Sequence, residues 1–375
     1  MSGSITTDDL ATRIDDAARA PYILDVRSSD AYDQWRIEGK VPLDIANIPY
    51  WTVLGEMESV LGTLPKHREV IVVCAHGGSS GMVVETIDQK NVHNLQGGMD
   101  AWANTLVPRT LWDDGSSFVV QFDRVAKGCL SYAVGSRGAS MAVIDAGASL
   151  EPYLALAEEM NTTITDAFDT HLHADHVSLG RQVAAHTGAT YRIASGDAET
   201  ARFDFAPLID GERFEYGDLD VVVRSVATPG HTPGSTSLEV AGRFLMTGDA
   251  VFVSGIGRPD LGGQTEPWAK DLFATIHETL AALDHGLEVC PAHYTSRAES
   301  RDDGTLHRSL GDLLTNDPIV SMTDEAAFVA YVVDHLGTPP SQYDDIRKVN
   351  LGHLQPDPEM LKELEVGRNE CALSK

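Results

Sequence analysis

Short apolar runs alternate with helical patterns through the first hundred residues. Residues 22–26 and 70–73 are apolar and rich in β-branched side chains, which predicts two buried strands. Each run ends in a polar turn that leads into a helical pattern. Strands that alternate with helices form parallel sheets, and ligand sites collect at the carboxyl ends of such strands. The pattern therefore predicts an α/β unit with its chemistry at one edge of the sheet.

The pattern changes after residues 108–117, a polar and turn-rich stretch at which we place a domain boundary. Residues 119–125, 128–134 and 141–145 predict closely spaced strands of the hairpin type, and residues 149–161 predict a helix. A mixture of hairpins and helices is typical of an α+β fold.

Helical patterns return from about residue 305 and end in a charged helix that begins at Pro358. The chain has 375 residues, which is more than one hydrophobic core usually organises. We therefore expect an α/β domain over residues 1–110 and an α+β domain with a helical tail over residues 111–375.

The composition excludes some partners. The chain carries 56 acidic and 28 basic residues, a formal charge of −28, so a nucleic acid would be repelled over most of the surface. Such acidity is typical of proteins adapted to a salty cytoplasm. No apolar run is long enough to span a membrane, and residues 1–10 resemble a capped helix more than a signal peptide. We expect a cytoplasmic location.

The most informative segment is THLHADH at residues 170–176, which places three imidazoles and a carboxylate directly after a predicted strand. On an extended chain His171 and His173 point to the same face, and we expect Asp175 and His176 to begin the next helix. Nitrogen and oxygen donors in one cluster suit zinc or iron(II).

Two later segments carry further metal-binding residue types. A proline and glycine loop at residues 228–234 isolates His231, and an apolar strand at residues 246–249 ends at Asp249. Rigid loops at strand ends position metal-binding side chains well. Taken alone, however, a histidine or an aspartate at such a place is more often an ordinary turn residue.

In this order HLHADH, PGHTPG, TGDAVF and a final PAH at residues 291–293 resemble the metallo-β-lactamase superfamily. The resemblance implies an αββα sandwich with the metal at one edge between two sheets. It leaves the reaction open, because one fold hosts hydrolases and oxidoreductases alike.

The GRPDL segment at residues 257–261 resembles the persulfide dioxygenases, a sulfur dioxygenase family. That resemblance implies one iron(II) held by His173, His231 and Asp249, a facial triad that leaves positions for a persulfide sulfur and O2. The neighbouring residues would support these ligands or line the site: His171, Asp175, His176 and His293. All seven could instead form the two-zinc site of a glyoxalase II-like thioester hydrolase.

Substrate contacts are expected next to the metal. Arg258 in the Gly-Arg-Pro turn could recognise an anionic persulfide carrier with Asp260 beside it, because a guanidinium binds carboxylates in a fixed two-pronged geometry. Tyr294 follows the last histidine where dioxygenases often have other residues, so its contact with substrate is a weaker expectation.

In the first domain, the strand at residues 70–73 ends at Cys74 and turns through glycines into a helix. Backbone amides of such a loop stabilise a thiolate or a bound anion. A lone cysteine after a strand is more often a small buried hydrophobe. The candidate anion loop comprises His76, Gly77, Gly78, Ser79 and Ser80.

The segments LDVR at 24–27, ANIP at 46–49 and LQGGMDAW at 95–102 together resemble a rhodanese domain. The resemblance implies that Cys74 carries sulfur. Ser79 stands where rhodaneses have an arginine, which removes one anion contact; His76 is a candidate replacement. We interpret Cys129, Cys290 and Cys371 as structural or incidental, with Cys290 also considered for sulfur exchange.

The two resemblances reinforce each other because both concern sulfane sulfur. We expect a persulfide, O2, and thiosulfate or sulfite as partners, with no nucleic acid and no membrane. The first domain could instead be a sulfur-sensing module without turnover. The sequence leaves the thiol carrier and a homo-oligomer open.

Overall fold

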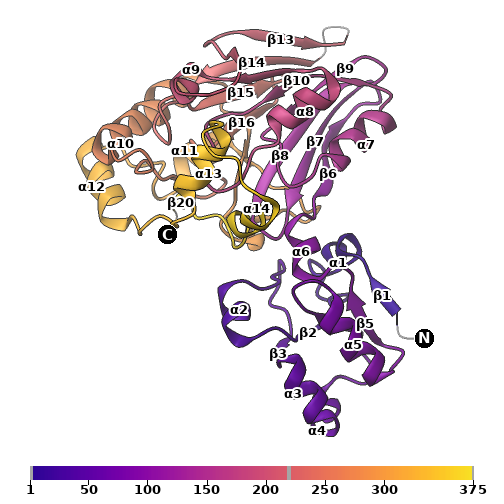
Figure 1. Ribbon diagram of the computed structural model, residues 1–375. Coiled ribbons are helices and arrows are strands. Elements are labelled where there is room, and N and C mark those ends of the chain that lie inside the picture. The colour runs from indigo at the N-terminus through magenta and orange to yellow at the C-terminus, as the bar shows by residue number, and fades with distance from the viewer. Residues whose placement is uncertain (1–2, 218–220, 374–375) are drawn as a thin grey trace.

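The first sheet is parallel throughout. The computed structural model describes residues 3–217 and 221–373. In strand order β1-β5-β4-β2-β3, this sheet is formed by β1 (Gly3–Ile5), β5 (Val92–Leu95), β4 (Val70–Val73), β2 (Tyr22–Asp25) and β3 (Ile45–Asn47). The helices around it are α1 (Thr7–Arg13), α2 (Ser29–Gln34), α3 (Tyr50–Gly55), α4 (Met57–Thr63), α5 (Gly78–Ile87) and α6 (Gly98–Ala103). The predicted α/β unit is confirmed (Figure 1).

Both faces of this sheet are covered, as parallel sheets require. On one face Ile71 and Val73 pack with α1 and α6. On the other face Val70 and Val72 pack with α3, α4 and α5. Because neighbouring residues of a strand point to opposite faces, a strand buried on both sides is apolar at every position.

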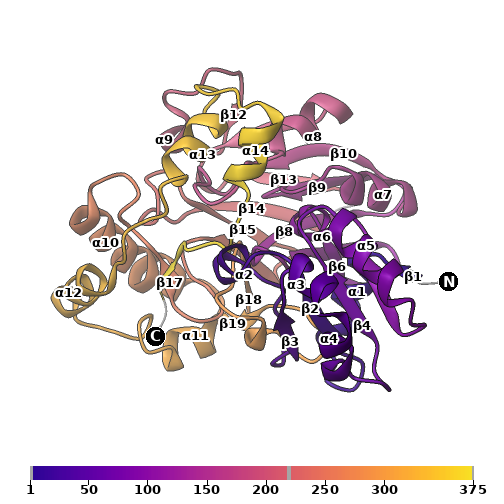
Figure 2. The ribbon, with the colours of Figure 1, turned by 60° about the horizontal axis from the view of Figure 1, so that its bottom comes forward.

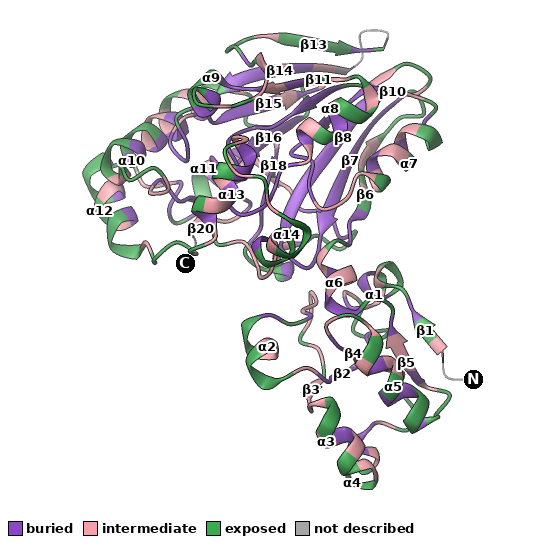
Figure 3. Cartoon of the chain, viewed as in Figure 1, coloured by how far each residue is buried: buried purple, intermediate pink, exposed green. Residues whose placement is uncertain are grey.

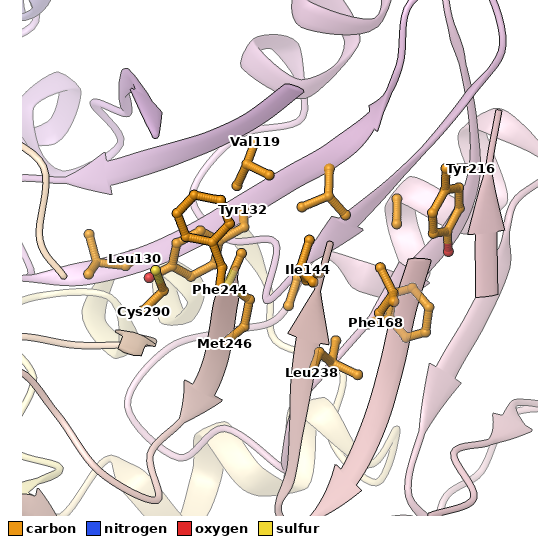
Figure 4. Packing of buried hydrophobic residues seen from close by; sticks show 14 of the residues in the cluster. Val119, Leu130, Tyr132, Ile144, Phe168, Tyr216, Leu238, Phe244, Met246 and Cys290 are labelled. Atoms are coloured by element: carbon orange, nitrogen blue, oxygen red, sulfur yellow. The ribbon is translucent and has the colours of Figure 1, made fainter. Parts of the chain in front are cut away.

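The rest of the chain contains two larger sheets. The second sheet consists, in strand order, of β12 (Ala206–Pro207), β11 (Thr190–Ile193), β10 (Thr163–Phe168), β9 (Ser140–Ile144), β8 (Cys129–Ser136), β7 (Ser117–Arg124) and β6 (Val107–Asp113). The third consists of β13 (Arg213–Tyr216), β14 (Val221–Ala227), β15 (Thr236–Val240), β16 (Phe244–Gly248), β18 (Glu288–Pro291) and β19 (Arg308–Ser309). The two sheets face each other across a shared apolar core (Figure 4).

Residues from both sheets meet in that core. Val119 and Tyr132 of the second sheet lie in the same buried cluster as Leu238 and Met246 of the third. Cys290 also lies there, fully buried among apolar side chains, which matches the interpretation of this cysteine as structural (Figure 4).

Helices cover the two outer faces. Against the second sheet pack α7 (Glu151–Glu159) and α8 (Gly180–Thr187). Against the third pack α10 (Thr265–Ala274), α11 (Leu310–Asn316) and α12 (Glu325–His335). The order helix, sheet, sheet, helix confirms the predicted αββα sandwich, and burial is concentrated in its sheets (Figure 3).

The C-terminal part returns to the edge of the sandwich (Figure 2). It comprises α13 (Tyr343–Asn350), α14 (Pro358–Leu364) and β20 (Ala372–Leu373), which pairs with β17 (Ile256–Gly257). The remaining helical segments are α9 (Ser195–Ala198), a π-helical turn at Thr275–Thr279, and 3₁₀ turns at Leu280–Ala282 and Arg297–Glu299. In the described ranges, none of the helices has both the length and the apolar composition that a bilayer crossing requires.

Two local expectations differ from the structure. The polar stretch expected at residues 108–117 contains most of strand β6, which already belongs to the second sheet. Pro108 is tolerated because β6 is an edge strand, and Trp112 packs against the inter-sheet core. Asp175 and His176 do not begin a helix: α8 starts at Gly180, and both residues lie in the preceding loop. The division at residues 110 and 111 stays a prediction.

Candidate functional sites

The predicted metal-binding residues meet at one edge of the sandwich because they follow strands that end there. His171 and His173 follow β10, His231 follows β14, Asp249 follows β16, and His293 follows β18. All five side chains are at most 1% exposed. The structure therefore brings together segments that are more than a hundred residues apart in the sequence.

The innermost group consists of His171, His231 and Asp249. The Nε2 atoms of the two histidines lie 3.6 and 3.5 Å from Asp249 Oδ2. None of these three atoms has a hydrogen-bond partner among the described residues, although all are buried. Buried polar atoms normally have hydrogen-bond partners. Two imidazole nitrogens and one carboxylate oxygen that converge without such partners therefore fit a bound cation.

His173 lies beside this group, and its role as a metal ligand stays a prediction. Its Nε2 lies 3.1 Å from Asp145 Oδ1. Its Nδ1 has no partner, and its ring centroid is 4.2 Å from that of His171. The structure thus groups His171, in place of His173, with His231 and Asp249.

A second group adjoins the first and contains Asp175, His176, His293 and Cys129. His293 connects the two groups: its Nδ1 lies 2.6 Å from Asp249 Oδ1 and its Nε2 lies 2.8 Å from Asp175 Oδ2, the latter without hydrogen-bond geometry. Cys129 Sγ donates to Asp175 Oδ2 at 3.2 Å. The contact of Cys129 with this group was not predicted, because a cysteine inside an apolar strand gives no local signal.

Burial and neighbouring charges set the protonation of the cluster. Burial lowers the pKa of His171 and of His231, which keeps both rings in the neutral form that binds metals. Burial also opposes charge on His293, but the carboxylates of Asp175 and Asp249 raise its pKa well above the usual value. The two carboxylates therefore favour the protonated form of His293.

Buried polar side chains hold the ligand loops in place. Asp145 accepts from the backbone N–H and the hydroxyl of Thr170, at 2.7 and 3.0 Å. Asp197 accepts from the backbone N–H groups of Leu172 and Gly234, so it ties the first histidine loop to the loop of His231. Such outer contacts orient metal ligands.

Two more positions were not predicted. Asn350 Nδ2 donates to the carbonyls of His173 and His176, both at 2.9 Å, from a helix more than 170 residues away. Gly248 has φ of +53°, and a Cβ there would lie 2.5 Å from Thr170 Oγ1. Only glycine fits this approach of β16 to the histidine loop.

Arg258 and Asp260 pair with each other through two hydrogen bonds of 2.7 and 2.8 Å. The guanidinium also donates to the carbonyls of Gly337 and Glu370, and the Arg258 carbonyl lies 2.8 Å from His231 Nδ1. Arg258 thus joins the C-terminal segment to a metal-site histidine, and its role in substrate binding stays a prediction.

Tyr294 is almost fully buried. Its hydroxyl donates to Asp123 Oδ1 at 3.0 Å and accepts from Arg297 at 3.2 Å. Its ring lies in the inter-sheet core. These contacts explain its burial by packing, and a contact with substrate stays a prediction.

The Cys74 loop is built from near neighbours. Cys74 follows β4 and is 5% exposed; its Sγ accepts from the Gly77 N–H at 3.1 Å and from the Ser80 hydroxyl at 3.0 Å. The sulfur therefore sits at the N-terminus of α5, where amides favour negative charge. Gly98 packs against this loop so closely that a Cβ would lie 2.2 Å from the Cys74 carbonyl.

The other members of the loop lie at its surface. His76 Nδ1 is 2.8 Å from Asp100 Oδ2, and Lys362 of α14 is 3.0 Å from the same atom. The His76 side chain is largely exposed and pairs with Asp100 at the surface. Gly78 and Ser79 begin α5. The role of His76 as a replacement for the missing arginine stays a prediction.

Comparison with known proteins identifies the class. Residues 124–293 match the model of the metallo-beta-lactamase superfamily, and residues 6–105 match that of the rhodanese-like domain. The chain therefore carries a rhodanese-like domain followed by a metallo-β-lactamase domain, as the motifs predicted.

Its curated relatives include members with two different activities. A hydroxyacylglutathione hydrolase of Anaeromyxobacter dehalogenans is 38% identical over 42% of this chain and 58% of its own length. The mitochondrial persulfide dioxygenase ETHE1 of Homo sapiens is 30% identical over 37% of this chain and 52% of its own length. The match thus spans little more than half of each relative.

Solved structures agree on the fold. A metallo-beta-lactamase from Staphylococcus aureus has a TM-score of 0.57 and 27% identity, over 64% of this chain and 74% of that one. ETHE1 from Myxococcus xanthus has a TM-score of 0.53 and 24% identity, over 66% of this chain and all of that one. These similarities support the sandwich fold.

Proposed function

We propose that this protein oxidises a low-molecular-weight persulfide with O2 at an iron(II) centre and moves sulfane sulfur through Cys74. The observation that carries the proposal is the convergence of the buried, unpartnered atoms of His171, His231 and Asp249 in a chain that also presents a rhodanese-type thiol. Two nitrogens and one oxygen on one side of a metal form the facial triad of oxygenases.

Iron(II) held by this triad would supply open positions at which the persulfide sulfur and O2 react. The overall change balances as RSSH + O2 + H2O giving RSH and H2SO3. His171 and His231 contribute neutral ring nitrogens because burial opposes their protonation. His231 is fixed by the Arg258 carbonyl at its Nδ1, which leaves Nε2 free for the metal.

Cys74 would act by nucleophilic displacement. Its thiolate attacks the outer sulfur of thiosulfate, the sulfur–sulfur bond breaks, and sulfite leaves with the electron pair. A small thiolate then attacks the outer sulfur of the Cys74 persulfide and regenerates the cysteine. The Gly77 amide and the Ser80 hydroxyl stabilise the charged sulfur, and the reverse sequence would convert persulfide and sulfite into thiosulfate.

The test measures O2 uptake and sulfite release with a panel of small persulfides, on protein whose metal content is known. We expect one sulfite per O2 consumed and activity that follows iron content. Protein that contains zinc and shows no O2 uptake would contradict the proposal.

A second candidate function is thioester hydrolysis at a two-zinc centre. It is favoured by the completeness of the second group, in which Asp175, His176 and His293 adjoin Asp249. Two metal ions clamp an attacking oxygen and a carbonyl. A glutathione thioester distinguishes the two functions, since only the hydrolase cleaves it without O2.

A further inference from the structure

A large cavity lies between the two domains. It has a volume of about 870 Å³ and is lined by α6 of the first domain and by α8, α13 and α14 of the second. Figure 1 shows α14 at this junction. Most of the wall is apolar, including Leu354 and Leu361. Binding sites for small molecules are roughly 300–1,000 Å³ in volume and often lie at domain interfaces. We call this space the interdomain cavity.

Two arginines of the wall lie on either side of Phe203. The Arg181 guanidinium lies over the Phe203 ring, 4.2 Å from its centroid, and donates to the Val349 carbonyl at 3.1 Å. Arg202 directly precedes Phe203 in the chain, and its side chain is exposed. Neither guanidinium pairs with a carboxylate among the residues that the structure describes. Both therefore keep N–H donors for a ligand.

The acidic side chains of the wall already have cationic partners. Asp100 of α6 pairs with Lys362 of α14 at 3.0 Å. Glu365 pairs with Arg124 at 2.6 Å. The two arginines beside Phe203 thus leave the cavity with a local excess of positive charge, in a chain whose formal charge is −28. Such a site attracts an anion, and its apolar wall favours a ligand that also has an apolar part.

The interdomain cavity borders both reactive loops. On one side, the Met99 N–H of the wall donates to the Cys74 carbonyl at 2.9 Å. On the other side, Val177 of the wall directly follows His176, a member of the second group. A molecule in this cavity would therefore lie against the segments that hold the sulfur-transfer loop and the histidine loop.

We propose that the interdomain cavity binds the anionic small thiol that carries the persulfide, with its carboxylate or phosphate group at Arg181 and Arg202. A guanidinium binds either anion through paired N–H donors. The apolar part of the carrier would lie along Leu354 and Leu361. The choice of a thiol carrier rests on the proposed function, whereas the preference for an anion rests on the cavity alone. A carrier held here would stay next to both reactive loops between one reaction and the other.

Isothermal titration calorimetry on the full-length protein tests the inference. The probes are the S-methyl derivatives of glutathione and of coenzyme A, which cannot bind a metal as thiolates. Glutathione carries carboxylates and coenzyme A carries phosphates, so separate titrations distinguish the two sources of the anion. We expect one of them to bind, and Arg181→Gln/Arg202→Gln to weaken its binding at least about tenfold. The control Arg19→Gln/Arg213→Gln removes the same charge from exposed positions outside the wall and should stay within about twofold of wild type.

The outcomes separate this inference from the proposed function. Failure of both derivatives to bind below about 1 mM, or equal losses in the two double variants, overturns the inference. Inorganic phosphate should bind at least about tenfold more weakly than the better derivative, and equal affinity would exclude a carrier site. If the carrier binds but no persulfide supports O2 uptake, the cavity site stands and the proposed function fails.

A second variant covers the case in which the arginine variant does not fold. Leu361 is 39% exposed on α14, and Leu361→Glu keeps a good helix former there while it brings a negative charge to the wall. We expect at least about a tenfold loss of affinity for the carrier derivative, with a smaller loss in the uncharged control Leu361→Gln. Unchanged affinity in Leu361→Glu would contradict the proposed site.

Discussion

The Cys74 loop and the metal cluster hold their reactive atoms in opposite ways. Cys74 Sγ is held by Gly77 and Ser80, at most six residues away. The metal cluster collects side chains from residue 129 to residue 371 and depends on the packing of two sheets and a C-terminal segment. A local site tolerates changes elsewhere in the fold, whereas a site assembled from distant loops is sensitive to each of them.

The largest expected effect comes from Asp249→Asn, which breaks only the metal cluster. An amide cannot replace a carboxylate that faces three histidines, so we expect metal content and O2 uptake to fall by about 100-fold or more. Metal analysis and oxygen-electrode assays measure this. Sulfur transfer by Cys74 should stay within about twofold of wild type, and a joint loss would show that the sites are not independent.

Cys74→Ser is the reciprocal change. A hydroxyl is a far weaker sulfur nucleophile, so thiosulfate sulfurtransferase activity should fall by at least about 100-fold while O2 uptake on added persulfide is retained. The assay follows thiol-dependent release of sulfite from thiosulfate. Equal rates for wild type and variant would indicate a sensor or docking module.

A comparison of His171→Ala with His173→Ala tests which histidine of the first loop binds the metal. We expect His171→Ala to abolish stable iron binding, because its Nε2 faces Asp249. His173→Ala should weaken iron binding by only about 10- to 100-fold, the usual cost of losing a residue that positions ligands. Chelator competition measures both affinities. A larger loss of iron affinity in His173→Ala than in His171→Ala would support His173 as the metal ligand, as the family resemblance implied.

The smallest expected effect concerns Glu365, which directly follows α14 and contacts the loop after the first histidines. Glu365 accepts from the Val177 N–H and pairs with Arg124; although burial opposes its charge, Arg124 and Lys127 lower its pKa to about 2. The ionised form therefore stabilises the fold above the unfolded pKa of about 4.5, and this stability is lost as the pH falls toward 2.

Glu365→Gln should thus lower the free energy of unfolding at pH 7 by on the order of 2–3 kcal/mol and flatten its decline between pH 4.5 and 2. Urea titrations across this range measure it. Glu363→Gln, two residues earlier and in the last turn of α14, is the matched control. Parallel pH profiles for Glu365→Gln and wild type would contradict the assigned role.

Some of these features could be predicted from sequence and others could not, for a physical reason. The strands around Cys74 and the strand-end positions of His231 and Asp249 follow from short-range periodicity. The orientation of His173 depends on Asp145, which is 28 residues away. The position of Cys371 near Asp249 and His293 depends on pairing between β17 and β20. Side-chain direction and long-range pairing leave no periodic signal.

Strand β6 illustrates the same limit. Its proline and polar residues are typical of a linker, but at a sheet edge they are compatible with a strand. Only the antiparallel pairing with β7 distinguishes the two, and that pairing is tertiary information.

The position of Cys371 in the chain has a consequence for biosynthesis. Domains generally fold in the order in which the ribosome releases them, so the Cys74 loop can be complete while the second sheet is still being made. The C-terminal neighbours of the metal cluster, Cys371 near Asp249 and the pairing of β20 with β17, can take their places only after residue 371 has emerged. The histidine and aspartate ligands are therefore synthesised before the segment that packs beside them.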